Sequence, residues 1–206
     1  MMDVIAAHRR SLAAALETLS ADQWQTPSLC AGWTVAHVLA HQTMPFRISE
    51  ADFMTGLQQS GGDFTIFSDA VAERDSKLPP AKLVAVLRDN AETPWSPPGG
   101  GLVGALTHDV IHGLDSAWPL GLVYEIPERA STTVLDALTR TGGQSLFGFP
   151  LAGIRVTATD VDWSAGNGAE LTGRSRDLVP LLAGRAVPHE VFDGEGAARA
   201  WSLAER

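Results

Sequence analysis

Four of the six histidines form two pairs with a four-residue spacing, His37 with His41 and His108 with His112. Residues four apart lie on one face of a helix, so each pair can present two imidazoles to a single point. Helix bundles build metal sites from such side chains on facing helices. A lone pair of this kind is more often two surface or half-buried histidines. Two pairs on core-facing helices strengthen the metal interpretation without deciding it.

Other reactive residues lie close to these pairs in the sequence. Asp115 follows His112 by three residues, so its carboxylate could orient that imidazole, with a solvated acid near a helix end as the alternative. Cys30 could act as a nucleophile, but a buried structural cysteine is the favoured interpretation. The tryptophans that flank the loops, Trp33 and Trp95 among them, are explained by core or lid packing.

The elements that must position the histidines are mainly helical. Apolar residues recur at three- and four-residue spacing, which predicts amphipathic helices. Pro45 would clash with the carbonyl of His41, so we expect a kink or a break beside that histidine. The segment PWSPPGGG is a loop. The predicted helical regions are about 2–20, 35–57, 68–90 with an interruption at Pro79 and Pro80, 102–118 and 127–142.

The sequence pattern changes beyond about Phe149. GIRVTATDVDW alternates β-branched and polar residues, GNG is typical of a hairpin turn, and AELTG is the expected partner strand. Two short helices follow. We therefore predict an α+β protein with a helical bundle over 1–146 and a small α+β C-terminal domain over 147–206.

Composition narrows the functional class. The 206 residues suffice for a substantial core. A net charge of −9, from 15 basic and 24 acidic residues, argues against nucleic-acid binding. The single cysteine excludes an internal disulfide, and neither a membrane-length apolar run nor a signal-peptide segment is present, so we expect a cytoplasmic protein.

Three motifs carry a family resemblance. PSLCAGWTVAHVLAH, residues 27–41, resembles the entry to the second helix of the mycothiol-dependent maleylpyruvate isomerase family, a branch of the DinB-like metalloenzymes. HDVIHGLD, residues 108–115, resembles its second metal motif, and ATDVDWSAGNGAELTGRSRDLVPLLAGR, residues 158–185, is similar to its C-terminal domain. The resemblance covers nearly the whole chain and implies a DinB-like, up-down four-helix-type bundle followed by the small domain.

The resemblance also implies a ligand set. By that matching His41, His108 and His112 hold a divalent metal ion, with zinc expected and nickel as the alternative. The isomerases typically carry glutamate where this chain has His108. Three neutral imidazoles leave the full charge on the ion, so it should acidify a bound thiol or water more strongly. For His37 we favour a role at the helix start or behind the ligands over direct ligation.

The leading functional hypothesis is a metal-dependent, mycothiol-dependent transferase or isomerase. A metal-bound thiolate would act on a small electrophilic molecule, with Arg47 and Arg140 as candidates for binding substrate carboxylates. The alternatives are a metal-dependent small-molecule hydrolase and a non-catalytic, metal-stabilised binding or regulatory protein. A fourth protein ligand, such as His37, would favour the last. The expected partners are the electrophile and a low-molecular-weight thiol, without nucleic acid or membrane, and the chain is expected to be a monomer or homodimer.

Overall fold

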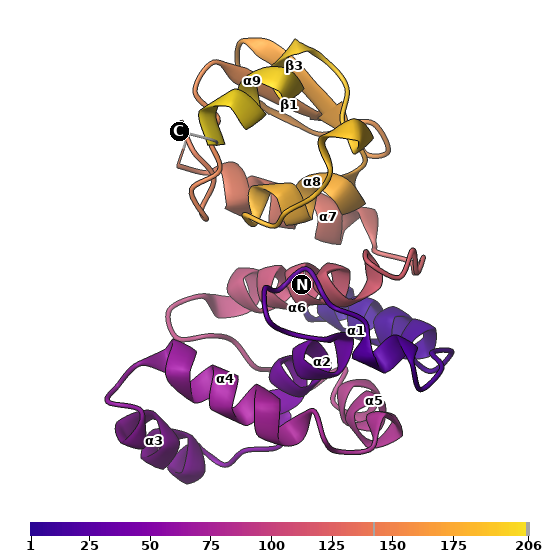
Figure 1. The fold of residues 1–206 in the computed structure, drawn as a ribbon, viewed down its shortest axis with the longest axis vertical. Coiled ribbons are helices and arrows are strands. Elements are labelled where there is room, and N and C mark those ends of the chain that lie inside the picture. Colours follow the sequence, from indigo (N-terminus) through magenta and orange to yellow (C-terminus); the bar gives the residue numbers. More distant parts are fainter. Residues whose placement is uncertain (142, 205–206) are drawn as a thin grey trace. The chain divides into compact units, whose positions relative to one another are not determined.

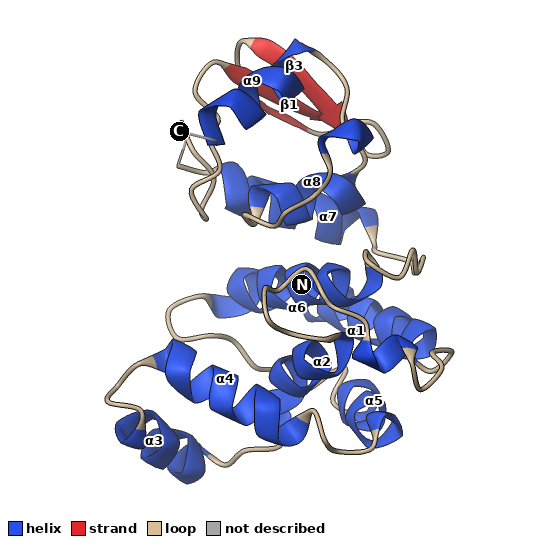
Figure 2. Cartoon of the chain, viewed as in Figure 1, coloured by secondary structure: helices blue, strands red, loops and turns tan. Residues whose placement is uncertain are grey.

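The chain forms two compact units, Met1–Glu125 and Ile126–Arg206. The structure, a computed structural model, describes residues 1–141 and 143–204, without the side chains of 201–204 (Figure 1). Within these residues the strands occur only in the second unit, as Figure 2 shows. The predicted α+β class is confirmed.

The first unit is built from helices. α2 packs against α4, α5 and α6, and α1 packs against α5 and α6 (Figure 1). The helices are α1 (Met2–Leu16), α2 (Val35–Thr43), α3 (Glu50–Gln59), α4 (Phe64–Asp75), α5 (Pro80–Asp89) and α6 (Gly101–Ala117).

A leucine-rich core holds α1, α2 and α5 together. Leu12 of α1, Leu39 of α2, and Leu83 and Leu87 of α5 are fully buried in one cluster. Burial of each such side chain stabilises the fold by about 2 kcal/mol before conformational entropy is subtracted. The core therefore fixes the orientation of α2 and, with it, the face that carries His41.

α2 is short because both of its ends are specified locally. At its start the Thr34 backbone N–H donates to His37 Nδ1, which also lies 2.8 Å from the Thr34 hydroxyl, as in a capping box. At its end Pro45 cannot continue the helix, and a 3-10 turn, Met44–Phe46, follows. The break predicted beside His41 is confirmed, and that histidine lies in the last turn of α2.

The second unit combines helices with a three-stranded sheet. α7 (Glu128–Thr139) and α8 (Ser175–Leu182) pack side by side, and α9 (Glu195–Ala204) packs against β1 and β3. The strands are β1 (Ile154–Ala158), β2 (Ser164–Gly166) and β3 (Ala169–Gly173), in the order β2-β1-β3.

The hairpin predicted at GNG is wrong. AELTG does pair with the preceding strand, but β3 runs parallel to β1, with Val156 opposite Leu171. The antiparallel neighbour of β1 is instead β2. Gly166 and Gly168 have φ values of 78° and 116°, and a Cβ on either would meet a backbone carbonyl at the start of β1. The two glycines therefore let the chain cross closely over β1 instead of turning back along β2.

The two compact units differ in extent from the predicted domains. The contacts group α7 with the second unit, whereas the sequence prediction placed residues 1–146 together. The domain division at 146 and 147 stays a prediction.

Among the described residues, no helix combines the length and apolarity that crossing a membrane requires.

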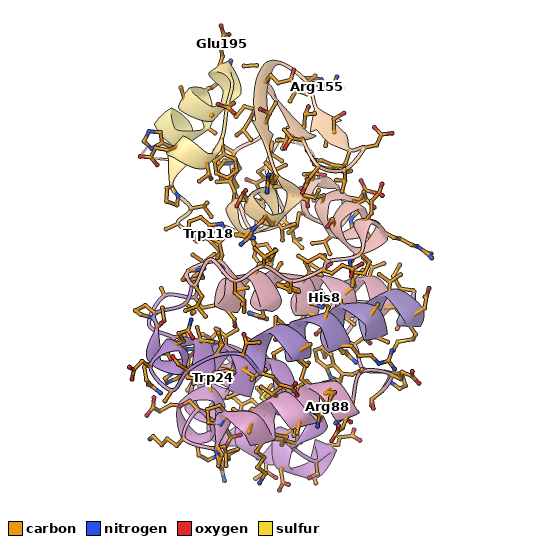
Figure 3. The ribbon with its side chains drawn as sticks, turned by 90° about the vertical axis from the view of Figure 1, so that its right-hand side faces the viewer. His8, Trp24, Arg88, Trp118, Arg155 and Glu195 are labelled. Atoms are coloured by element: carbon orange, nitrogen blue, oxygen red, sulfur yellow. The ribbon has the colours of Figure 1, made fainter. Side chains whose placement is uncertain are left out.

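His8 of α1 faces α6 (Figure 3). The pKa of its side chain predicts how the stability of the fold depends on pH. Burial lowers its pKa to about 4 from the usual 6.5, opposed in part by the charge of Asp109. Between these pH values the unfolded chain binds a proton that the folded chain excludes, so stability falls on acidification. We expect the wild type to lose about 3 kcal/mol more than His8→Gln across this window. Denaturant unfolding measures the difference, and equal losses would contradict the assignment.

Candidate metal centre

α6 presents two of the predicted ligands to α2. Its 17 residues place His108 and His112 one turn apart, while Val110 and Ile111 between them are buried in the unit. Both histidines are half-buried, and His41 on α2 is 6% exposed. The two helices pack directly against each other, so one face of α6 meets the last turn of α2.

The three imidazoles converge on one point. The ring centroid of His41 lies 5.3 Å from that of His108 and 4.8 Å from that of His112, and the two α6 rings are 4.7 Å apart. The Nε2 atoms of His41 and His108 are 3.3 Å apart. One ring nitrogen from each histidine lies within 4.8 Å of the others, which is close enough for a single ion to contact all three.

Each of these imidazoles has a polar partner at its other nitrogen, Nδ1. A partner at Nδ1 fixes the ring and leaves the Nε2 lone pair available to a metal, the arrangement that metal-binding histidines usually show. The partners are Ser68 Oγ at 2.9 Å from His41, Asp109 Oδ1 at 3.1 Å from His108, and Asp115 Oδ2 at 3.0 Å from His112.

Burial favours the neutral forms of His41 and His108. Desolvation, followed by the charges of His112 and His108, lowers the pKa of His41 to about 2. Desolvation also lowers the pKa of His108, although its hydrogen bond to Asp109 opposes the shift. Because a neutral imidazole is the form that donates to a metal, the site is set for binding at neutral pH. The donor set and its geometry therefore fit a divalent ion.

A buried ion pair holds Asp109 behind His108. Arg9 of α1 is completely buried, and its Nε donates to Asp109 Oδ2 at 2.6 Å. Its Nη1 donates to the carbonyls of Asn90 and Thr93, in the loop that leads to α6. Burial alone would raise the pKa of Asp109, but the His108 hydrogen bond and the Arg9 charge lower it. The carboxylate therefore stays charged and accepts from the imidazole N–H.

Of the two residues predicted to support the ligands, Asp115 lies beside the three imidazoles and His37 does not. Asp115 is buried and lies against His112, as its spacing predicts. His37 points away from the three rings: its Nδ1 contacts Thr34, and its Nε2 lies 2.9 Å from Glu73 Oε2. Its contacts are those of a helix-start residue.

Cys30 lies beside the site. Its Sγ is 3.0 Å from Asp115 Oδ2 and 3.9 Å from His112 Nδ1, and the residue is half-buried. The thiol thus shares Asp115 with a candidate ligand and supports the same carboxylate. Its position fits a structural role close to the metal centre better than an isolated core cysteine.

The predicted substrate arginines are placed differently. Arg47 pairs with Asp75, and its guanidinium also donates to Thr43 Oγ1 and the Ala40 carbonyl. All three of its nitrogens are therefore used within the protein, and we do not propose it as a carboxylate clamp. Arg140 directly follows α7 in the second unit, and its substrate role stays a prediction.

Ser68 and Asp109 are the supporting residues that sequence reasoning missed. Asp109 is adjacent to His108, but neighbours in a helix point in different directions, so the spacing rule did not select it. Ser68 lies 27 positions from His41, and no local motif connects them. The only sequence signal for either residue was the position of Asp109 inside the motif HDVIHGLD.

Asp115 supplies a testable prediction. Asp115→Asn keeps the shape of the side chain but removes the charge that holds His112, so we expect metal affinity to fall about 10–100-fold. Competition with a chromophoric chelator measures the affinity. Asp136→Asn, which alters a carboxylate bound to Trp163 in the second unit, is the matched control and should leave it unchanged. Unchanged affinity in Asp115→Asn would exclude the orienting role.

Comparison with known proteins gives one family match and two similar folds. The model of the mycothiol maleylpyruvate isomerase N-terminal domain matches residues 5–93, a segment that includes His41 and ends before His108. No curated protein matches the chain. Two solved structures share its fold: the mycothiol-dependent maleylpyruvate isomerase and a histidine-to-alanine mutant of it, with 19% and 18% identity. Each has a TM-score of 0.58, with 94% of this chain and 91% of the other covered.

The matched segment contains the first of the three sequence motifs, residues 27–41, and the two solved structures show the fold. The predicted resemblance to the mycothiol maleylpyruvate isomerase family is therefore confirmed over residues 5–93.

Proposed function

We propose that the chain is a metal-dependent thiol enzyme. His41, His108 and His112 would hold a divalent ion, zinc or nickel, and mycothiol would supply the thiol that attacks a small electrophile. The observation that carries the proposal is the convergence of three imidazoles, each with Nδ1 occupied by a partner. The match of residues 5–93 to the mycothiol maleylpyruvate isomerase N-terminal domain supports the choice of thiol.

The residues of the chain would prepare the site for this chemistry. A bound ion would supply positive charge that lowers the pKa of a thiol and favours the nucleophilic thiolate. Asp109 and Asp115 keep two imidazoles in the orientation and tautomer that direct Nε2 inward. Ser68 holds the ring orientation of His41 from α4. Because the three rings are held in advance, little reorganisation would accompany binding.

The composition of the site favours an enzyme over a closed structural metal site. Among the described residues, His41, His108 and His112 form one group of possible ligands, and Cys30 and Asp115 form a second group with His112 alone. Structural zinc sites usually have four ligands around one ion. His37, the residue considered as a fourth ligand, is bound to Thr34 and Glu73 instead. A position is thus left for thiol or water.

The deciding experiment combines elemental analysis with a thiol assay. We expect the purified chain to hold about one divalent ion and, when metal-loaded, to consume mycothiol in the presence of an electrophile panel. Glutathione in place of mycothiol tests the choice of thiol. Product formation without any thiol would select the hydrolase. Metal binding without turnover by thiol or water would select the binding or regulatory protein.

A further inference from the structure

Three aromatic side chains surround the candidate ligands. We call Trp33, Phe64 and Trp95 the aromatic collar. Trp33 lies 5.1 Å and Phe64 lies 6.5 Å, centroid to centroid, from His41, and Trp95 lies 5.0 Å from His108. They come from three separate segments: the loop before α2, the start of α4 and the loop before α6.

The collar offers apolar surface instead of being sealed in the core. Trp33 and Trp95 are half-buried, and Phe64 is 48% exposed, although it also packs against Phe53 at a centroid distance of 6.3 Å. Beside it, Ile66 is 57% exposed. Exposed apolar side chains gathered at a polar site are typical of ligand-binding surfaces.

The arginines of the first unit all have partners within the protein. Arg47 donates to Asp75, Thr43 and Ala40, and Arg9 is buried against Asp109. The remaining arginines of this unit also pair with acids: Arg10 with Glu92, Arg74 with the buried Asp75, and Arg88 with Glu17. A substrate carboxylate at the collar would lose water and gain no arginine of this unit as a bidentate partner, and the thiolate would already occupy the open position of the proposed ion.

We propose that the collar selects a neutral electrophile that carries an aromatic group, and that it discriminates against a carboxylate-bearing one. This inference rests on the proposed function for the reaction, but the collar makes it testable by binding alone. Indole and phenyl rings would stack on a neutral, electron-poor ring, whereas an added carboxylate would be desolvated there. The proposal therefore names a substrate class for the same site.

The reaction probe is chlorodinitrobenzene, compared with chlorodinitrobenzoate. The thiolate sulfur attacks the ring carbon that carries chlorine, the C–S bond forms, the C–Cl bond breaks, and chloride leaves with its electron pair. The thiol proton passes to solvent, and nothing is oxidised or reduced. We expect kcat/KM for the neutral compound to exceed that for the carboxylate by at least about tenfold after correction for their uncatalysed rates.

Binding is measured separately with the unreactive dinitrobenzene and dinitrobenzoate. Quenching of tryptophan fluorescence in the protein without added metal reports the affinity of each. We expect dinitrobenzene to bind about tenfold more tightly, and Phe64→Ala to remove most of this preference without changing the metal content. Phe147→Ala, which truncates a phenylalanine that is 52% exposed in the second unit, is the matched control and should keep it.

The outcomes separate the two proposals. Equal or tighter binding of dinitrobenzoate, or an unchanged preference in Phe64→Ala, would overturn the inference even if thiol is consumed. Selective binding of dinitrobenzene with no thiol consumption by the metal-loaded chain would support the collar and contradict the proposed thiol chemistry.

Discussion

Replacing His41 with alanine is expected to lower metal affinity by more than about 100-fold and to abolish thiol-dependent turnover. Loss of a residue that hydrogen-bonds a metal ligand typically lowers metal affinity about 10–100-fold, and loss of the ligand itself should lower it further. His41 is the one candidate ligand that α2 contributes, so its removal leaves two donors, both on α6. Elemental analysis after dialysis, with turnover measured at saturating metal, tests the expectation.

His37→Ala is the matched control for this experiment. It removes the same residue type from the same helix, one turn earlier, but its imidazole contacts Thr34 and Glu73 rather than the cluster. We expect metal content to stay near that of the wild type, with a stability loss of about 1 kcal/mol from the capping interaction. Equal metal loss in both variants would show that the helix, not the ligand, is responsible.

His108→Glu refines the same test. Glutamate is the residue that the resembling isomerases typically carry here, and a carboxylate oxygen can replace an imidazole nitrogen on zinc. We expect this variant to retain metal, unlike His108→Ala. If neither variant retains metal, the hydrogen bond between the imidazole and Asp109 is needed to position a ligand at residue 108.

Removal of the Asp109 carboxylate is expected to have the largest effect on stability. Asp109→Ala leaves Arg9 buried without its counter-ion, and breaking such a pair from one side costs about 3–5 kcal/mol. A domain is typically stable by about 5–15 kcal/mol, so this loss is a large fraction of the total. Denaturant unfolding of the metal-free protein, with the midpoint and slope both fitted, measures it.

The surface ion pair of Arg10, the residue next to Arg9, provides the comparison. Glu92→Ala breaks the pair with Arg10, whose side chain is 53% exposed, and should change stability by less than about 1 kcal/mol. If Asp109→Ala does not fold, Asp109→Asn keeps the shape and should still weaken metal binding through His108. A loss for Asp109→Ala as small as that for Glu92→Ala would contradict the buried pair.

The histidine geometry was largely predictable because it depends on local periodicity. Two residues four apart on a helix share a face in any fold, and Pro45 ends α2 for steric reasons that involve its own segment. The choice of His41 over His37 came from family resemblance, since spacing alone favoured neither. The structure brings His41 together with both α6 histidines, while their role as ligands stays a proposal.

Contacts distant in sequence were beyond this kind of prediction. Arg9 and Asp109 are 100 residues apart, and nothing near either residue indicates the other. The parallel pairing of β1 and β3 was missed because a GNG turn after an alternating strand favours a hairpin locally. The close approach of Gly166 and Gly168 to the start of β1 depends on the path of the chain, which local propensity does not encode.

The spread of the imidazoles along the chain has a mechanical consequence. His41 and His108 are 67 residues apart, so an ion shared by them would tether the two ends of a long loop. A covalent bridge across a loop of that size is worth about 4 kcal/mol of denatured-state entropy. A bound ion would thus act as a reversible cross-link in a chain whose single thiol rules out an internal disulfide. Removal of the ion should first loosen the packing of α2 against α6.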